Sequence, residues 1–449
     1  KQFLLSSDRE KRAKLIDKVL EREEFVDYWT YRWSDLFLLS GERLRPKALD
    51  AFSGWIRKQV EQNTAWDEFA RKVILATGNS YENGAVNFYA LHQDPLDTAE
   101  TVSMAFMGMA INCARCHDHP LEKWTNNDYY GMANLFSRVR AKGWGGDFRN
   151  GDGNRDVYVV ERGELIQPRL GEPQPPRPLQ GEPVSFESTE DRREHLVDWL
   201  VAEDNPYFSK AITNRVWANF LGVGIVENVD DLRLTNPPSN QALFEALALY
   251  LEEQDYDLKS LMRLILNSET YQRSSHFVAG NESDKRFYSH YYPRRLKAEV
   301  LLDAVSQVLE APTKFDGYEE GTRALELRDV NVSSYFLDAF GRPERLATCE
   351  CERSDEPSMV QVLHLVNGDT LNQKLAQNKN LLGHIQEQNL ADAEIVDSAY
   401  LRAFSRFPTS QERIQILEVL SETLPAERRQ VLEDLYWSLL SSREFLFQH

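Results

Sequence analysis

Two of the four cysteines in this sequence lie close together, and a histidine directly follows the second. Residues 113–119 read Cys-Ala-Arg-Cys-His-Asp-His. Two thiols at this spacing can form thioether bonds to the two vinyl groups of a haem, and the imidazole that follows can ligate the iron. We therefore predict covalent haem attachment at Cys113 and Cys116, with His117 as the proximal iron ligand.

The same residue types also permit chemistry without haem. The cysteines can form a tetrahedral zinc site of four thiolates, made by Cys113, Cys116 and the second pair, Cys349 and Cys351. Alternatively, the first pair is a local disulfide. A third interpretation is a metal-dependent hydrolase built from neighbouring imidazoles and carboxylates. Its candidate ligands are His117, His119, Asp118 and Asp128.

The second cysteine pair opens another chemically dense segment, Cys-Glu-Cys-Glu-Arg-Ser-Asp-Glu-Pro at residues 349–357. Pro357 predicts a helix start, and a helix N-terminus favours thiolate, so Cys349 and Cys351 are a candidate metal-binding or redox-active pair. The competing interpretation is a structural loop in which Glu352 and Arg353 form solvated ion pairs. A separate hypothesis, which rests on the scarcity of cysteines, is that the C-terminal part brings Cys349 and His364 close to His117.

A sixth iron ligand is not obvious from the sequence, and the iron could equally be five-coordinate. His364, on the helix predicted to follow Pro357, is a candidate second ligand, and His92 is another. Met104 lies on a helix before the first motif, where methionines more often fill a core than bind a metal. Farther along, Arg215 is expected to pair with Asp230 or Asp231, or else with an anionic group.

Helical periodicity dominates the elements that must position these residues, and strand signals are few and short. The fold class is therefore mostly α, in two helical domains joined by a Gly/Pro-rich linker. We place a helical domain that carries the Cys-x-x-Cys-His motif at 1–145, the linker at 146–187 and a second helical domain at 188–449. One short strand is expected at 157–160. Helices are expected at 97–111, 125–139, 189–203, 206–221, 239–254, 258–269, 294–310, 356–377, 390–405, 410–423 and 426–445.

The charge balance narrows the classes of partner. The formal net charge is −19, which argues against non-specific nucleic-acid binding. It also disfavours docking on anionic membranes and suits a neutral or cationic partner. No stretch of the sequence is apolar for long enough to predict membrane insertion.

The motif segments resemble a known pairing of domains. Residues 98–136, "TAETVSMAFMGMAINCARCHDHPLEKWTNNDYYGMANLF", resemble the cytochrome c-like domain abundant in planctomycetes. Residues 205–240 and 340–368 ("FGRPERLATCECERSDEPSMVQVLHLVNG") are similar to its usual C-terminal partner, a domain of unknown function. The resemblance covers almost the whole chain. It implies export, a suspected redox role and an upstream or separate cytochrome c as redox partner.

Two functional hypotheses from different classes follow. The first is an exported mono-haem c-type redox protein, periplasmic or on the cell surface, because covalent haem is assembled outside the cytoplasm. It would transfer electrons, or oxidise a small or carbohydrate-type substrate and pass electrons to another cytochrome. Whether it is an enzyme, as a haem-dependent oxidoreductase, stays open. The second is a non-haem interaction or scaffold protein of the cell surface, stapled by zinc or disulfides.

Overall fold

A computed structural model describes residues 1–143, 153–353, 357–388 and 390–448. The fold is mostly α, as predicted, and the strands are short. The first helices are α1 (Gln2–Leu5), α2 (Lys11–Leu20), α3 (Glu23–Leu36), α4 (Pro46–Glu61), α5 (Trp66–Ile74), η1 (Gly84–Val86), α6 (Asn87–Leu91), α7 (Pro95–Met107), η2 (Asn112–Arg115) and α8 (Asn126–Asn134), where η denotes a 3-10 turn.

Five of the short strands lie in or before the predicted linker. They are β1 (Gly78–Asn79), β2 (Val139–Gly143), β3 (Arg155–Val159), β4 (Ile166–Gln167) and β5 (Glu172–Pro173), of which the last three lie within it. The three-stranded sheet is antiparallel with the order β1-β3-β2, and β4 pairs with β5. The strand expected at 157–160 is thus confirmed as β3, which begins two residues earlier than expected.

The rest of the chain is helical apart from one strand pair. The elements are α9 (Arg192–Leu200), α10 (Phe208–Leu221), α11 (Gln241–Glu253), α12 (Leu258–Asn267), β6 (Arg294–Arg295), α13 (Ala298–Leu309), η3 (Ala324–Glu326), α14 (Tyr335–Ala339), η4 (Glu350–Glu352), α15 (Met359–Asn367), α16 (Asp369–Ala376), α17 (Leu381–Gln388), α18 (Asp392–Phe404), α19 (Ser410–Glu422), α20 (Arg428–Leu440), α21 (Arg443–Leu446) and β7 (Phe447–Gln448). Strand β7 pairs antiparallel with β6 and so returns the chain end to the start of α13. No helix in the described ranges is both long and apolar enough to cross a membrane.

Local capping explains where the helices around the motif begin and end. Helix α7 starts at Asp94, whose carboxylate accepts the Leu96 amide at 2.9 Å, and Pro95 fills its first position. It ends at Gly108, which has a φ of +60°. The expected helix 97–111 is therefore too long at its end, because the left-handed glycine turns the chain before the cysteines. Helix α8 starts with a capping box between Thr125 and Asp128.

The expected helix 356–377 is two helices rather than one. Gly368 adopts an extended conformation between α15 and α16, and its amide donates to the carbonyl oxygen of His364 at 2.8 Å. A glycine at this point stops the first helix, and Asp369 starts the next. Helix α17 was not expected, because only three of its positions are buried and its apolar pattern is short.

Two hydrophobic cores organise the molecule. The first gathers buried side chains between Leu20 and Tyr291, and the second gathers those between Ala298 and Leu446. The first core includes Val157 and Leu179 from the predicted linker and continues through α12. The proposed division at 146–187 stays a prediction; the packing itself changes from one core to the other just before α13.

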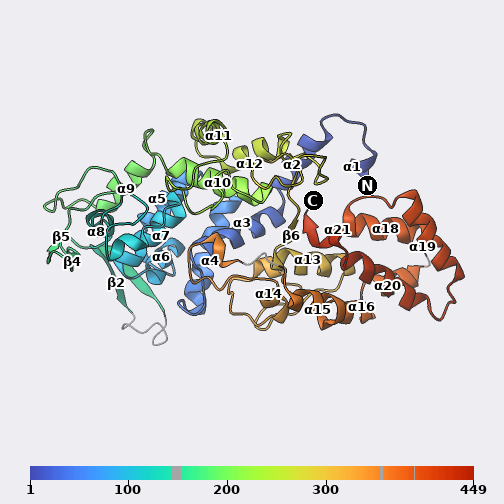
Figure 1. The fold of residues 1–449 in the computed structure, drawn as a ribbon. Coiled ribbons are helices and arrows are strands. Elements are labelled where there is room, and N and C mark those ends of the chain that lie inside the picture. Colours follow the sequence, from blue (N-terminus) through green and yellow to red (C-terminus); the bar gives the residue numbers. More distant parts are fainter. Residues whose placement is uncertain (144–152, 354–356, 389, 449) are drawn as a thin grey trace.

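Figure 1 shows an elongated arrangement of these elements. Helices α6–α9 and strands β2, β4 and β5 lie at one end, α18–α20 lie at the other, and α3, α13 and β6 lie between them. Helix α3 belongs to the first core but also contacts η3, which follows α13. The boundary between the two cores is therefore spanned by α3.

Candidate functional site

The cysteine–histidine loop lies on the surface between α7 and α8. Asn126, the first residue of α8, donates its side-chain amide to the carbonyl oxygens of Ala114 (2.7 Å) and Arg115 (2.9 Å). Its backbone amide donates to Oδ1 of Asp118 at 2.9 Å. One buried asparagine therefore fixes both ends of the loop that carries the motif.

The three residues of the motif are exposed. The thiols of Cys113 and Cys116 are both free. Nδ1 of His117 lies 2.7 Å from the carbonyl oxygen of Asp118. Because a carbonyl oxygen only accepts, Nδ1 carries the hydrogen in the neutral ring and Nε2 keeps the lone pair. This backbone contact is the kind that orients a metal-ligating histidine.

His119 has a structural role in the same loop. It is buried, its backbone amide donates to the Trp124 carbonyl at 2.8 Å, and its Nδ1 accepts the Leu121 amide at 3.2 Å. Burial and the nearby Arg233 guanidinium hold the pKa of His119 below its usual value. The ring therefore stabilises the turn after the motif.

The carboxylates proposed for a hydrolase centre are engaged elsewhere. Asp118 accepts from Asn126, and Asp128 both caps α8 and pairs with Arg177 at 2.6 Å. Across the described ranges, no three His, Cys, Asp or Glu side chains come close enough together to hold a metal ion. The structure thus does not assemble the predicted set of His117, His119 and these two carboxylates.

The second cysteine pair is only partly described. Cys349 is disulfide-bonded, whereas the side chain of Cys351 lies outside the described part of the structure. A disulfide sulfur is not a thiolate, so in this state Cys349 does not ligate a metal. The helix start predicted at Asp355 or Glu356 falls outside the described residues, and α15 is instead capped by Ser358, whose hydroxyl accepts the Gln361 amide at 3.3 Å.

His364 does not join the motif. Its Nε2 lies 2.9 Å from the Thr370 hydroxyl, and its ring packs against Tyr335, Phe336 and Phe340. In Figure 1 its helix, α15, is well separated from α8. His364 therefore belongs to an aromatic cluster of the second core and is far from the cysteine–histidine loop.

The neighbours of the two cysteine motifs do meet. Asn112, directly before Cys113, and Cys349 line one cavity of about 420 Å³. His92 and Met104, two candidate ligands from the sequence, line it as well, whereas Cys113, Cys116 and His117 do not. The C-terminal part is thus brought beside the N-terminal motif region through this cavity, whereas proximity of Cys349 to His117 itself stays a prediction.

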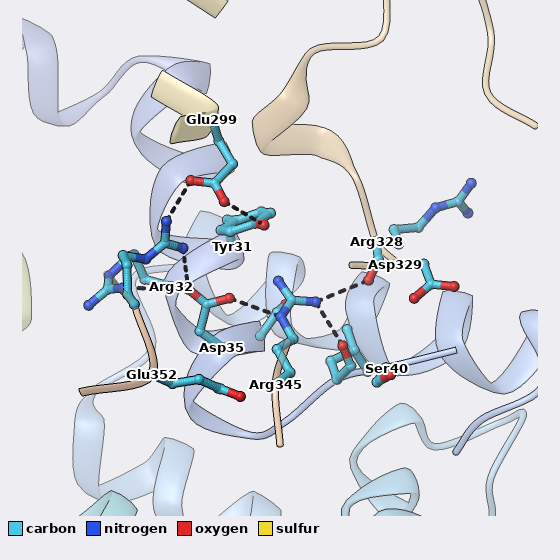
Figure 2. Close-up of polar contacts among 12 residues, drawn as sticks. Tyr31, Arg32, Asp35, Ser40, Glu299, Arg328, Asp329, Arg345 and Glu352 are labelled. Carbon is cyan, nitrogen blue, oxygen red and sulfur yellow. Dashed lines mark hydrogen bonds and ion pairs between the residues drawn. The ribbon is translucent and has the colours of Figure 1, made fainter. Parts of the chain in front are cut away.

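A buried ion network holds the segment around Cys349 in place, and Figure 2 shows its centre. Asp35 of α3 pairs with both Arg345 and Arg353, each at 2.9 Å. Arg353 also pairs with Glu299 at 2.7 Å, and the Tyr31 hydroxyl donates to the same carboxylate at 2.9 Å. The expected solvated pair at Arg353 is wrong, because this guanidinium is buried between two carboxylates.

The network continues toward η4. Arg215 pairs with Asp230, as the sequence predicted, and Asp230 also accepts the Glu350 amide at 2.6 Å. The Glu350 carboxylate pairs with Arg32 of α3. Burial opposes ionisation of Glu350, but Arg32 and its other cationic neighbours hold the pKa of this carboxyl well below its usual value. The spacing of these residues carries no signal for the network, because its members come from segments that are far apart in the sequence.

In a comparison with family models, each half of the chain matches one family. Residues 192–420 match the model described as PSD1, a protein of unknown function (DUF1553), and residues 1–141 match PSCyt2, also of unknown function (DUF1549). The chain belongs to the PSD1 family. PSCyt2 followed by PSD1 is the planctomycete two-domain pairing that the sequence resemblance indicated. No curated protein and no solved structure matches the chain.

Proposed function

We propose that this PSD1-family chain is an exported redox protein that holds one haem through Cys113 and Cys116, with His117 as an iron ligand. The supporting observation is the exposure and hydrogen bonding of these three side chains. Both thiols are free and exposed, and the exposed His117 ring directs its Nδ1 hydrogen to a backbone carbonyl. Nε2 is therefore the nitrogen available to a metal.

The residues around the loop fit such a group. The Arg233 guanidinium acts electrostatically on Cys113, which places a cation beside the attachment site for the carboxylates of a haem. Leu121 and Leu234 are exposed large apolar side chains in the two segments that flank the loop, and the Leu234 amide donates to Glu122 at 2.8 Å. When bound, haem supplies a one-electron carrier. The chain contributes the thiols, the imidazole and a partly apolar rim.

The disulfide at Cys349 supports the proposed compartment. Disulfides persist in oxidising surroundings outside the cytoplasm, where covalent haem is also attached. The net charge of −19 suits a partner with a cationic docking face, such as another cytochrome c. Electrons would pass between the exposed motif and that partner.

The same disulfide favours one competing function, a disulfide-stapled interaction or scaffold protein of the cell surface. In that case Cys113 and Cys116 are free thiols or a second disulfide and carry no haem. The two functions differ in the covalent state of these two residues, which is directly measurable.

The test is intact mass and a visible absorption spectrum of the protein exported from a host that assembles c-type haem. We expect a mass increase of one haem and a Soret band that shifts on reduction. Cys113→Ser with Cys116→Ser should lose both, and His117→Ala should keep the mass but change the spectrum. His276→Ala, an exposed histidine remote in sequence, is the matched control and should behave like the wild type.

A colourless protein of unmodified mass would overturn the proposal if the same host loads a reference c-type cytochrome. Titration of Cys113 and Cys116 with a thiol reagent would then decide between free thiols and a disulfide. Either result would support the stapled interaction protein.

A further inference from the structure

The cavity beside the motif has the size and position of a ligand site. It holds about 420 Å³ and lies where the C-terminal part meets the first core. One wall comes from α7, including Asp97, Glu100 and Thr101, and the opposite wall comes from residues 346–349. At the volume of liquid water, this space equals about 14 water molecules. Ligand pockets of this size commonly form at domain interfaces.

Two buried polar groups on its walls lack protein partners. Within the described ranges, neither Oγ1 of Thr348 nor Nε2 of His92 has a hydrogen-bond partner, and the two residues are only 8% and 3% exposed. Buried polar atoms are nearly always bonded, and leaving one unbonded costs about 1–3 kcal/mol. One group lies behind each side of the cavity, and neither atom is accessible to solvent, so a bound molecule contacts them only if the walls move.

The His92 ring is neutral at ordinary pH. Burial, and then the Arg43 charge, lower its pKa to about 3. The backbone of Phe37 opposes this shift as a hydrogen-bonding neighbour of the ring. The other nitrogen, Nδ1, faces the Thr101 hydroxyl at 3.3 Å. The inner wall therefore offers uncharged hydrogen-bonding groups.

The charged groups around the cavity largely neutralise one another. Arg115 pairs with Asp97 at 3.3 Å and with Glu100 at 3.5 Å, and the Tyr129 hydroxyl donates to Glu100. Arg43 lines the cavity as a second cation. The lining thus holds one guanidinium and two carboxylates, and Arg115, outside the lining, pairs with both carboxylates, so a ligand needs no net charge to complement the site.

From these features we infer that the cavity binds a small neutral molecule rich in hydroxyl groups, of about monosaccharide size. Carboxylates and uncharged acceptors would take its hydroxyl hydrogens, and Arg43 and Asn112 would donate to its oxygens. Leu346, Ala347 and Met104 supply apolar surface for its carbon face. Such a mixture of apolar walls and a few polar groups is the usual lining of small-molecule sites.

The ligand site is connected to the cysteine–histidine loop. Arg115, which lies between Cys113 and Cys116, holds both cavity carboxylates. A ligand that binds Asp97 or Glu100 therefore competes for the ion pairs of Arg115, a residue of the motif itself. The inference goes beyond the haem proposal, because binding requires no haem.

The experiment is isothermal titration of the full chain with neutral sugars (glucose, galactose, mannose and xylose). The best of these is then compared with its uronate and its amino sugar, which keep the shape but add a negative or a positive charge. We expect the neutral sugar to bind at least tenfold more tightly than either charged form. Ala347→Trp, which adds bulk from the exposed wall, should weaken binding more than tenfold. Ala279→Trp, on an exposed loop outside the cavity, should leave binding unchanged.

Three outcomes would overturn the inference: no neutral sugar binds, a charged form binds most tightly, or folded Ala347→Trp binds like the wild type. Circular dichroism of each variant establishes that it is folded. A colourless protein that binds a neutral sugar would refute only the haem proposal, and a haem-loaded protein that binds none would refute only this one.

Discussion

At the scale of single residues, the buried ion network is the feature with the largest energetic consequence. Glu299 is 1% exposed and Arg353 is 5% exposed, so both charges have left water. Burial alone would raise the pKa of Asp35, but Arg345 and Arg353 hold it below its usual value. Each charge is tolerated only because its partners are present. Removal of one member leaves another buried and uncompensated.

Replacement of Glu299 by Gln tests this dependence. The amide keeps the shape and can still accept from Tyr31, but Arg353 loses one of its two carboxylates. Breaking a buried pair in this way typically costs about 3–5 kcal/mol of the free energy of unfolding. Guanidinium unfolding curves of the variant and the wild type measure that difference.

The matched control is Asp198→Asn, which removes the exposed partner of Arg71 at 2.8 Å. An exposed pair contributes about 0–1 kcal/mol, so this variant should unfold close to the wild type. Equal losses for the two variants would contradict the assignment of Glu299 to a buried network.

At the scale of elements, the sequence predicted most helices because their buried positions recur with helical spacing. Helix α12 is an example, with Leu258, Leu261, Met262 and Ile265 on one buried face. Helix α7 was placed correctly except at its end, where Gly108 interrupts it. The capped start at Thr125 was predicted, whereas the start of α7 was expected at Asp97 and lies at Pro95, because a cap depends on a hydrogen bond that several nearby residues could equally make.

The candidate site was predictable only in part. The cysteine–histidine spacing identified the motif, since its chemistry is local. The cavity and the ion network were not predictable, because Asp35, Glu299 and Arg353 become neighbours only through tertiary packing. Periodicity identifies which face of a helix is buried, but not which element covers it.

One element contact has a pH-dependent consequence. Asp303 of α13 accepts the backbone amides of Ala324 (2.6 Å) and Leu325 (3.1 Å), which begin η3. Burial raises its pKa to about 7, against 3.8 for an ordinary aspartate. Between about pH 4 and 7 the folded state keeps a proton that the unfolded state has released. The free energy of unfolding therefore falls as the pH rises through this window.

Replacement of Asp303 by Asn should flatten that dependence. The single amide oxygen can accept from only one of the two backbone groups, and the side chain cannot ionise. Each unit of pKa difference that the change removes is worth about 1.4 kcal/mol. Unfolding free energies at several pH values between 4 and 7 provide the slope. Asp434→Asn, at an exposed position of α20, should retain the wild-type slope. An unchanged slope in Asp303→Asn would show that the pH dependence of the unfolding free energy does not come from Asp303.

At the scale of the whole molecule, α3 connects two cores that are otherwise built from different parts of the chain. Its Asp27 pairs with Arg57 in the first core and with Arg323 beside η3. Asp35, its penultimate residue, pairs with Arg345 and Arg353 from the segment that carries Cys349. The cavity lies beside this junction, so rigidity of the junction also sets the shape of the proposed ligand site.

This arrangement predicts that the two cores unfold together. Arg345 is fully buried and Arg353 nearly so, and both depend on Asp35. In Asp35→Asn the two guanidinium groups lose their shared counter-charge, and the contact between the cores becomes unfavourable. Differential scanning calorimetry should give one transition for the wild type and two for the variant. For a unit of 150–250 residues, each kcal/mol lost lowers the midpoint by about 2–4 °C.

Asp17→Asn is the control for this experiment, because it removes an exposed partner of Arg263 at 2.6 Å within the first core. It should leave a single transition near the wild-type midpoint. Two transitions in the wild type would show that α3 does not couple the cores. A single transition in Asp35→Asn would show that apolar contacts, rather than the buried charges, carry the coupling. With either result, we would no longer expect substitutions at the buried charges of this junction to alter the shape of the cavity.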